Sequence, residues 1–241
     1  MKSVLPALCA LATSLMLSGC STPSAEALAQ HDPWEATNRD VFAFDVWVEH
    51  HVAEPVDDGY RAVMPGPARE GVHNVTTNLH EPIVLANDVL QGDGKKTVRT
   101  LGRILINSTI GLGGLIDVAS KIGIPYHDND FGITLGQDGI AEGSYLVLPL
   151  VGPMPPRDLL GSAVDGTFDP FNYTRFPGRH IFLYARSGLR VLDTVDQQRD
   201  QLDSIERSSI DFYATARNLY RQSRDARIKG EDSATTQLPD L

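Results

Sequence analysis

Cysteine is almost absent from this chain of 241 residues. The only two, Cys9 and Cys20, lie within the first twenty residues, and none follows them. The rest of the chain therefore excludes a disulfide framework, a cysteine-ligated zinc site and a thiol nucleophile.

Apolar runs long enough to cross a bilayer are also lacking. The N-terminal run from Val4 to Leu17 is shorter than the ~20 residues that a membrane-spanning helix needs. One positive charge, Lys2, precedes the run, and small residues follow it. These features predict a cleaved signal peptide over residues 1–19.

The signal peptide ends in Leu17-Ser18-Gly19-Cys20, which resembles the lipobox of bacterial lipoproteins. The resemblance implies cleavage between Gly19 and Cys20, with a diacylglycerol and an N-acyl chain attached to Cys20. Each buried CH₂ group contributes about 0.8 kcal/mol, so three chains would anchor the protein durably. An ordinary secretory signal with an incidental cysteine is the alternative. Ser21, in the place of an aspartate, favours the outer membrane.

Basic charge is scarce as well. Lysine and arginine total 21 against 31 for aspartate and glutamate, and the net charge of −10 becomes about −11 once Lys2 leaves with the signal peptide. Nucleic-acid binding is excluded because it needs clustered basic groups that neutralise phosphates. The acidic balance also disfavours attraction to anionic lipid headgroups. Membrane attachment must therefore come from the lipid and from apolar surface.

Motifs of catalysis and cofactor binding are missing. No G-x-S-x-G elbow of an α/β-hydrolase occurs. Residues 92–97 lack the first glycine of a P-loop, and residues 127–130 lack the spacing of an EF-hand. Ser144 and His127 are the nearest candidates for a nucleophile and a base. The sequence therefore predicts no enzyme, no metal site and no cofactor beyond the lipid on Cys20.

Apolar residues recur at helical spacing along most of the chain, and strand alternation is nearly absent. This predicts an all-α fold with no substantial β-sheet. Asp32 and Glu35 are the predicted caps of the first helix, which Pro55 is expected to end. A further helix is expected from Pro67, with an interruption at Pro82. Others are expected over 95–108 and 157–164, and a long one begins at Arg179 with a break at Ser208-Ser209.

Two kinds of segment stand apart from these helices. Residues 41–48 are apolar on most sides, so they must be buried or in lipid. Residues 109–125 are apolar and glycine-rich, which suits a packed turn or a hairpin dipping into the membrane. Residues 20–31 are predicted to be a flexible tether and residues 230–241 a disordered tail, on either side of one helical domain over 32–229.

The order of the motifs is similar to that of the MlaA (VacJ) lipoproteins, the outer-membrane component of a phospholipid-trafficking system. The similarity extends from about Asp32 to Tyr220. It rests on Asp32-Pro33-x-Glu35 with Asn38-Arg39, Pro65-x-Pro67-Ala68-Arg69, Asn78-Leu79-x-Glu81-Pro82, Asn87, Gln91-Gly92-Asp93, Arg103, Asn107, Gly111-Leu-Gly113-Gly114-Leu-Ile-Asp117, Phe131-Gly132-x-Thr134-Leu135-Gly136, Gly139, Gly143, Tyr145, Pro149 and Arg157-Asp158.

This resemblance implies a ring of helices in the inner, periplasmic leaflet of the outer membrane. A polar passage through the ring would let phospholipids misplaced in the outer leaflet move inward to a soluble periplasmic carrier. Trimeric outer-membrane porins are the implied protein partners, and no reaction is catalysed. A structural lipoprotein that braces porins or the envelope is one alternative, and a lipid-modifying enzyme is another.

A passage needs polar groups, because a headgroup that loses water without new partners costs several kcal/mol. Polar residues set in or beside apolar stretches are the candidates: Asn38, Arg39, Asn78, Glu81, Asn87, Arg103, Asn107 and Asp117. The alternative is that they cap helices or tie them together by buried hydrogen bonds. Gly111, Gly113 and Gly114 are candidates for a flexible gate, although glycine also permits tight packing.

Overall fold

The computed structural model describes residues 23–230. The predictions for the signal peptide, for Gly19 and Cys20, and for residues 231–241 of the tail lie outside the described residues.

The regular secondary structure of the described chain is helical apart from one small hairpin, which confirms the predicted all-α fold. Strands β1 (Val147–Leu148) and β2 (Gly152–Pro153) pair antiparallel, with Val147 opposite Pro153. The α-helices are α2 (Ala25–Ala29), α3 (Glu35–Val48), α4 (Glu54–Val63), α5 (Gly66–Leu90), α6 (Gly94–Thr109), α7 (Val118–Lys121), α8 (Phe131–Gln137), α9 (Pro156–Phe168), α10 (Arg179–Ser208) and α11 (Phe212–Ile228). A π-helical turn, η1 (Glu49–Ala53), joins α3 to α4, and a 3₁₀ turn, η2 (Pro170–Asn172), follows α9.

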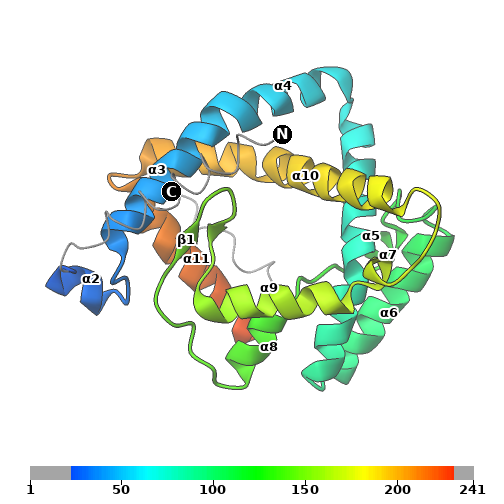
Figure 1. The fold of residues 1–241 in the computed structure, drawn as a ribbon. Coiled ribbons are helices and arrows are strands. Elements are labelled where there is room, and N and C mark those ends of the chain that lie inside the picture. Colours follow the sequence, from blue (N-terminus) through cyan, green and yellow to red (C-terminus); the bar gives the residue numbers. More distant parts are fainter. Residues whose placement is uncertain (1–22, 231–241) are drawn as a thin grey trace.

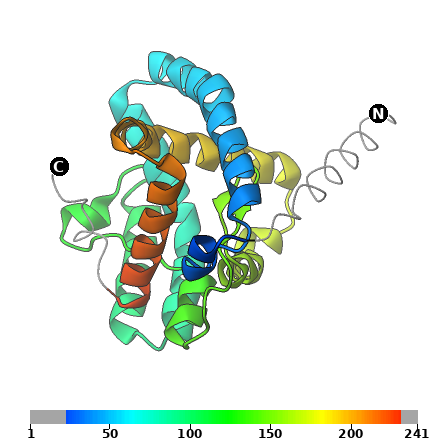
Figure 2. The ribbon, with the colours of Figure 1, turned by 90° about the vertical axis from the view of Figure 1, so that its left-hand side faces the viewer.

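The helices follow one another around a closed frame (Figure 1). One side consists of α3, η1 and α4, the next of α5 with α6 beside it, and α9 lies opposite α4. Helix α10 crosses the frame from α5 to α3, and α11 leads from its end to α8 (Figures 1 and 2). The arrangement agrees with the ring that the resemblance implied.

Two prolines do not have the effect predicted for them. Pro55 lies in the first turn of α4, and the helical path continues because Glu54 N–H bonds to the carbonyl of Glu49, five residues back. Such a π-type hydrogen bond spans one residue more than an α-helical one, so the chain takes up an extra residue before Pro55 without breaking the helix. Pro82 lies inside α5, which runs unbroken to Leu90. Packing of α5 against α6, α9 and α10 outweighs the hydrogen bond that the proline removes.

The described part of the predicted tether contains a short helix. Ser24 caps α2 by accepting a hydrogen bond from the backbone N–H of Ala27, and the side chain of Ala27 is buried. The flexible tether expected over 20–31 is therefore wrong for residues 25–29, since a side-chain cap and one buried contact suffice to order them.

The distribution of side chains is inverted relative to an ordinary soluble domain. Buried polar and charged residues outnumber buried apolar ones, and the apolar core is a small cluster of Val41, Tyr145, Val147 and Tyr213. Large apolar side chains are instead exposed along most helices, among them Phe44, Trp47, Val98, Leu105, Ile110, Leu112, Leu160, Ile181 and Tyr184. Within residues 23–230, none of the helices combines the length and the apolar character needed to span a bilayer.

Candidate functional site

The polar interior is built from ion pairs and hydrogen bonds that join different helices. Arg103 of α6 donates from Nε to Oε1 of Glu81 on α5 at 2.6 Å, and its other nitrogens reach Asp117, Ser120 and the carbonyl of Ile124. The Glu81 and Arg103 side chains are only 1% and 2% exposed. A buried ion pair is stable only with such additional partners, so this network holds α5, α6 and α7 in register.

Asp117 connects this network to the glycine-rich turn. It caps α7 by accepting from the Ser120 backbone N–H, and it accepts from Asn107 Nδ2 at 3.0 Å. Burial raises the pKa of this carboxyl, but the hydrogen bonds from Ser120, Asn107 and Arg103 outweigh it and lower the pKa to about 2. Asp117 is therefore ionised at neutral pH and fixed in place.

A second network lies between α5, α8 and α9. Asn87 donates to Asp165 at 2.8 Å and accepts from the hydroxyl of Thr134 at 2.9 Å. Next to it, Asp88 accepts from Thr100 and lies 2.9 Å from Nε2 of His127. The segment 127–130, which lacks the spacing of an EF-hand, thus contributes a buried histidine. Among the described residues no group of acidic or histidine side chains is arranged to hold a metal ion.

Asp32 forms the centre of a third network and does not cap α3 as predicted. The backbone of Trp34 begins the helix without a side-chain cap, whereas Asp32 is fully buried. Its carboxylate accepts from Asn38 at 2.8 Å, from the Tyr213 hydroxyl at 2.5 Å and from Arg217 at 2.7 Å. The network joins the N-terminal segment to α11, which no local pattern could reveal.

Arg39 and Glu35 form a surface counterpart of this network. Arg39 makes two hydrogen bonds to the Asp211 carboxylate, at 2.7 and 3.0 Å, and one to Glu35. These contacts with Arg39 lower the pKa of Asp211 to about 2. The capping role predicted for Glu35 is therefore wrong, because its carboxylate pairs with Arg39 one turn ahead.

The predicted passage residues are therefore mostly parts of these networks. Asn38, Asn78, Glu81, Asn87, Arg103 and Asn107 are buried, and each forms a hydrogen bond to another element. Arg39 and Asp117 are partly exposed. This placement favours the second interpretation of these residues, in which they tie helices together.

The three candidate gate glycines are packed in different ways. A Cβ atom at Gly111 would clash with the carbonyl oxygen of Ile116, and one at Gly114 would lie 2.6 Å from Cβ of Asn78. Gly113 has open space around it and a φ of +73°. Tight packing thus accounts for Gly111 and Gly114, and backbone conformation accounts for Gly113. Between them Leu112 points its side chain outward and is 70% exposed.

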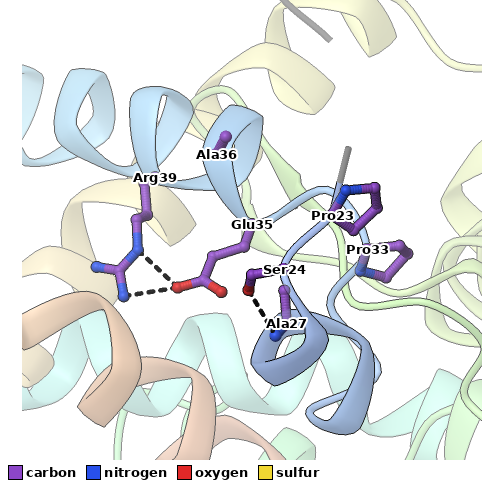
Figure 3. A pocket seen from close by; sticks show the side chains of 7 residues that line it. All are labelled: Pro23, Ser24, Ala27, Pro33, Glu35, Ala36 and Arg39. Carbon is purple, nitrogen blue, oxygen red and sulfur yellow. Dashed lines mark hydrogen bonds and ion pairs between the residues drawn. The ribbon is translucent and has the colours of Figure 1, made fainter. Parts of the chain in front are cut away.

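A hollow of about 340 Å³ lies where the N-terminal segment meets α3 (Figure 3). Pro23, one of its lining residues, is three residues from Cys20 in the sequence. Its polar groups are already paired with one another, as Glu35 with Arg39 and Ser24 with the Ala27 N–H (Figure 3). The lining consists of Pro23, Ser24, Ala27, Pro33, Glu35, Ala36 and Arg39.

Sequence reasoning missed the ion pairs of α10 and α11. Arg61 of α4 bonds to Asp196 of α10, and Arg224 of α11 bonds to Asp130 and Asp158. The sequence does contain one signal for these ion pairs, the helical spacing of Arg217, Arg221 and Arg224. Three arginines on one face of a helix imply acidic partners. The partners themselves lie far away in the sequence.

These features define a helical protein with a largely polar interior and many exposed apolar side chains. The family model for the MlaA lipoprotein matches residues 30–227. The chain belongs to the MlaA lipoprotein family.

Two relatives carry the same description. The intermembrane phospholipid transport system lipoprotein MlaA of Escherichia coli (strain K12) is 32% identical over 245 residues, covering 99% of this chain and 94% of that protein. Its namesake in Haemophilus influenzae (strain ATCC 51907 / DSM 11121 / KW20 / Rd) is 30% identical over 226 residues, covering 92% of this chain and 89% of that protein. A solved structure described under "Structural basis for maintenance of bacterial outer membrane lipid asymmetry" matches with a TM-score of 0.72 and 31% identity, covering 82% of this chain and 98% of its own.

Proposed function

We propose that this protein moves phospholipids between membranes without catalysing a reaction. It removes phospholipids misplaced in the outer leaflet of the outer membrane and passes them to a soluble periplasmic carrier, which maintains lipid asymmetry. The relatives named as lipoproteins of an intermembrane phospholipid transport system support this proposal, as does the solved structure concerned with lipid asymmetry.

The apolar exterior is the observation that carries the proposal. Leu112 and Tyr184 belong to helices and turns far apart in sequence, yet both expose most of their surface. Exposed apolar area of this extent is unfavourable in water and marks contact with a membrane or a partner. The acyl chains on Cys20 would deliver the protein to the inner leaflet of the outer membrane, where this surface would meet lipid.

The polar interior supplies the second requirement of a lipid conduit. A headgroup crossing a leaflet needs polar groups to replace its water. The helices of the closed frame (Figure 1) are joined by buried polar groups, and we propose that partly exposed members of these networks, such as Asp117, face the passage. Trimeric porins, which the resemblance implies, would stand beside the ring and shield part of its apolar surface. Co-purification of the full lipoprotein with a porin trimer tests this partner.

Two other functions are less well supported. A brace for porins or the envelope would need the anchor and the apolar surface but no polar interior. A lipid-modifying enzyme would need Ser144 and His127 together. Nε2 of His127 is instead bonded to Asp88, and His127 forms no hydrogen bond to Ser144 among the described residues.

The proposal is tested in a strain that lacks this protein. We expect phospholipid to accumulate in the outer leaflet, accessible to an added phospholipase, together with sensitivity to detergent. Wild-type protein restores both, whereas a Cys20→Ala variant fractionates away from the membrane and restores neither. Normal asymmetry in the null strain would overturn the proposed function.

A further inference from the structure

One arginine on α10 has only a histidine ring as its side-chain partner, whereas the other four on that helix bond to carboxylates or to backbone carbonyls. Arg179 bonds to the carbonyls of Phe171 and Asn172. Arg186 bonds to Asp169 and to the carbonyl of Leu79, and Arg199 bonds to Asp57 and Asp58. Arg190 has no carboxylate within salt-bridge distance among the described residues. The only hydrogen-bond contacts of its side chain in the described chain are to the ring of His80, at 3.0 Å from Nδ1 and 3.4 Å from Nε2.

A basic side chain is a poor partner for this guanidinium. A neutral imidazole accepts a hydrogen bond at one nitrogen only, and guanidinium has five N–H donors. Most of the donors of Arg190 are therefore left without a hydrogen-bond partner, and its charge has no direct ion pair among the described residues. The guanidinium of Arg190 on α10 therefore faces an imidazole ring on α5, and an anion beside it would supply the missing charged partner.

The surroundings of His80 keep the imidazole neutral. Its side chain is 13% exposed, and burial, followed by the nearby Arg190 charge, lowers the pKa of His80 to about 4. Arg190 is itself exposed, so the charged group of the pair is the one open to a ligand. A neutral, buried imidazole thus supports a cation that remains accessible.

A carboxylate and a phenol complete the cluster. Asp128 lies 3.9 Å from Nε2 of His80 and is held by Arg227 of α11 at 2.8 Å, and Tyr126 lies in the same loop. The Asp128 side chain is 33% exposed and Tyr126 is 36% exposed. Burial raises the pKa of Asp128, but Arg227 and His80 outweigh it and lower the pKa below its ordinary value. A positive and a negative group therefore flank one imidazole, and both are accessible.

Helix α10 also separates polar from apolar surface at this point. At 100° per residue, Arg186, Arg190 and Asp193 share the face that packs on α5, whereas Ile181, Tyr184 and Val191 lie on the opposite face. The helix crosses the frame between α5 and α3 (Figure 1). A molecule with a charged end and apolar chains could contact both faces of such a helix.

We infer that Arg190, supported by His80 and flanked by Asp128, binds the phosphodiester of a zwitterionic phospholipid headgroup. The inference rests on the proposed function, because it gives that function a headgroup site. Arg190 donates to the phosphate oxygens, and Asp128 accepts from the ammonium of the same headgroup. A free phosphate dianion lacks the ammonium and is repelled by Asp128, so the site favours the lipid.

The test measures binding to the full lipoprotein in non-ionic detergent and phosphate-free buffer. The probes are dihexanoyl-phosphatidylethanolamine, dihexanoylglycerol and inorganic phosphate. We expect Arg190→Gln to weaken binding of the phospholipid about tenfold, the loss of one charge-assisted contact. Arg190→Lys should restore part of it, and dihexanoylglycerol should bind all variants alike. Arg207→Gln, on the same helix with its side chain 74% exposed, is the matched control and should bind as the wild type does.

Three results would overturn the inference. Unchanged phospholipid binding by a folded Arg190→Gln variant would remove Arg190 from the site. Inorganic phosphate binding as tightly as the phospholipid would identify a free-phosphate site. Equal losses of phospholipid binding in Arg190→Gln and Arg207→Gln would show that the loss follows from the changed net charge of the protein and not from a site at Arg190. A null strain with normal asymmetry contradicts the proposed function itself, whereas full rescue by Arg190→Gln with unchanged binding contradicts only this site.

Discussion

Arg103 and Glu81 form an ion pair at 2.6 Å between α6 and α5 that is almost completely shielded from water. Removing one member leaves the other as an uncompensated buried charge, which costs about 3–5 kcal/mol. We therefore expect Arg103→Met to lower the free energy of unfolding by that amount, measured by chemical denaturation in detergent. Replacing both members, as Glu81→Leu with Arg103→Met, should recover much of the loss. Arg207→Met, at an exposed position of α10, should change stability by less than about 0.5 kcal/mol.

The glycine-rich turn provides a matched pair of substitutions. Gly113 and Gly114 both have positive φ, so alanine is strained at either position by roughly 1 kcal/mol. At Gly114 the new Cβ would also press on Asn78, whereas at Gly113 it meets open space. We expect Gly114→Ala to lower the melting temperature clearly more than Gly113→Ala. Equal effects would show that the turn is loose enough to relax, as a gate requires.

His80 should make stability depend on pH between about 4 and 6.5. Burial and Arg190 lower its folded-state pKa to about 4, against an ordinary value of 6.5. The unfolded chain therefore binds a proton in this range that the folded chain does not, so stability falls as the pH falls from 6.5 toward 4. The charged groups facing the imidazole are Arg186, Arg190, Asp128 and Asp130.

The measurement is the unfolding free energy of wild type and His80→Gln across this range. The pKa shift means that the wild type loses about 3 kcal/mol of unfolding free energy between pH 6.5 and 4. Over the same range the loss in the His80→Gln variant should be smaller by about 3 kcal/mol. Parallel curves for the two proteins would mean that His80 titrates as it does in water.

Local sequence predicted the helices because their apolar spacing and end signals are local. The predicted helix over 95–108 lies within one residue of α6, and the break at Ser208-Ser209 separates α10 from α11. Pro55 and Pro82 were misread, since a π turn and tertiary packing compensate for the lost backbone bonds. Such compensation is decided by other parts of the chain.

The polar interior could be predicted only in part. Asn78, Glu81 and Arg103 stood out as polar residues in apolar stretches, which correctly located the interior side of α5 and α6. Their partners could not be assigned, because the contacts that decide their roles connect distant segments. Arg39 with Asp211 and Asp32 with Arg217 are examples. Arg190 gave no signal at all, since its pairing with the His80 ring is decided by tertiary packing.

The central claim is that the apolar exterior faces acyl chains, and Trp47 tests it most directly. Trp34 and Trp47 are the only tryptophans of the chain, so Trp34→Phe leaves one tryptophan, on the exposed apolar side of α3 with Phe44. Its indole is 52% exposed. In vesicles, phospholipids brominated on their acyl chains should quench this fluorescence strongly, and aqueous acrylamide should quench it weakly. Strong quenching by acrylamide with none by the brominated chains would contradict the account.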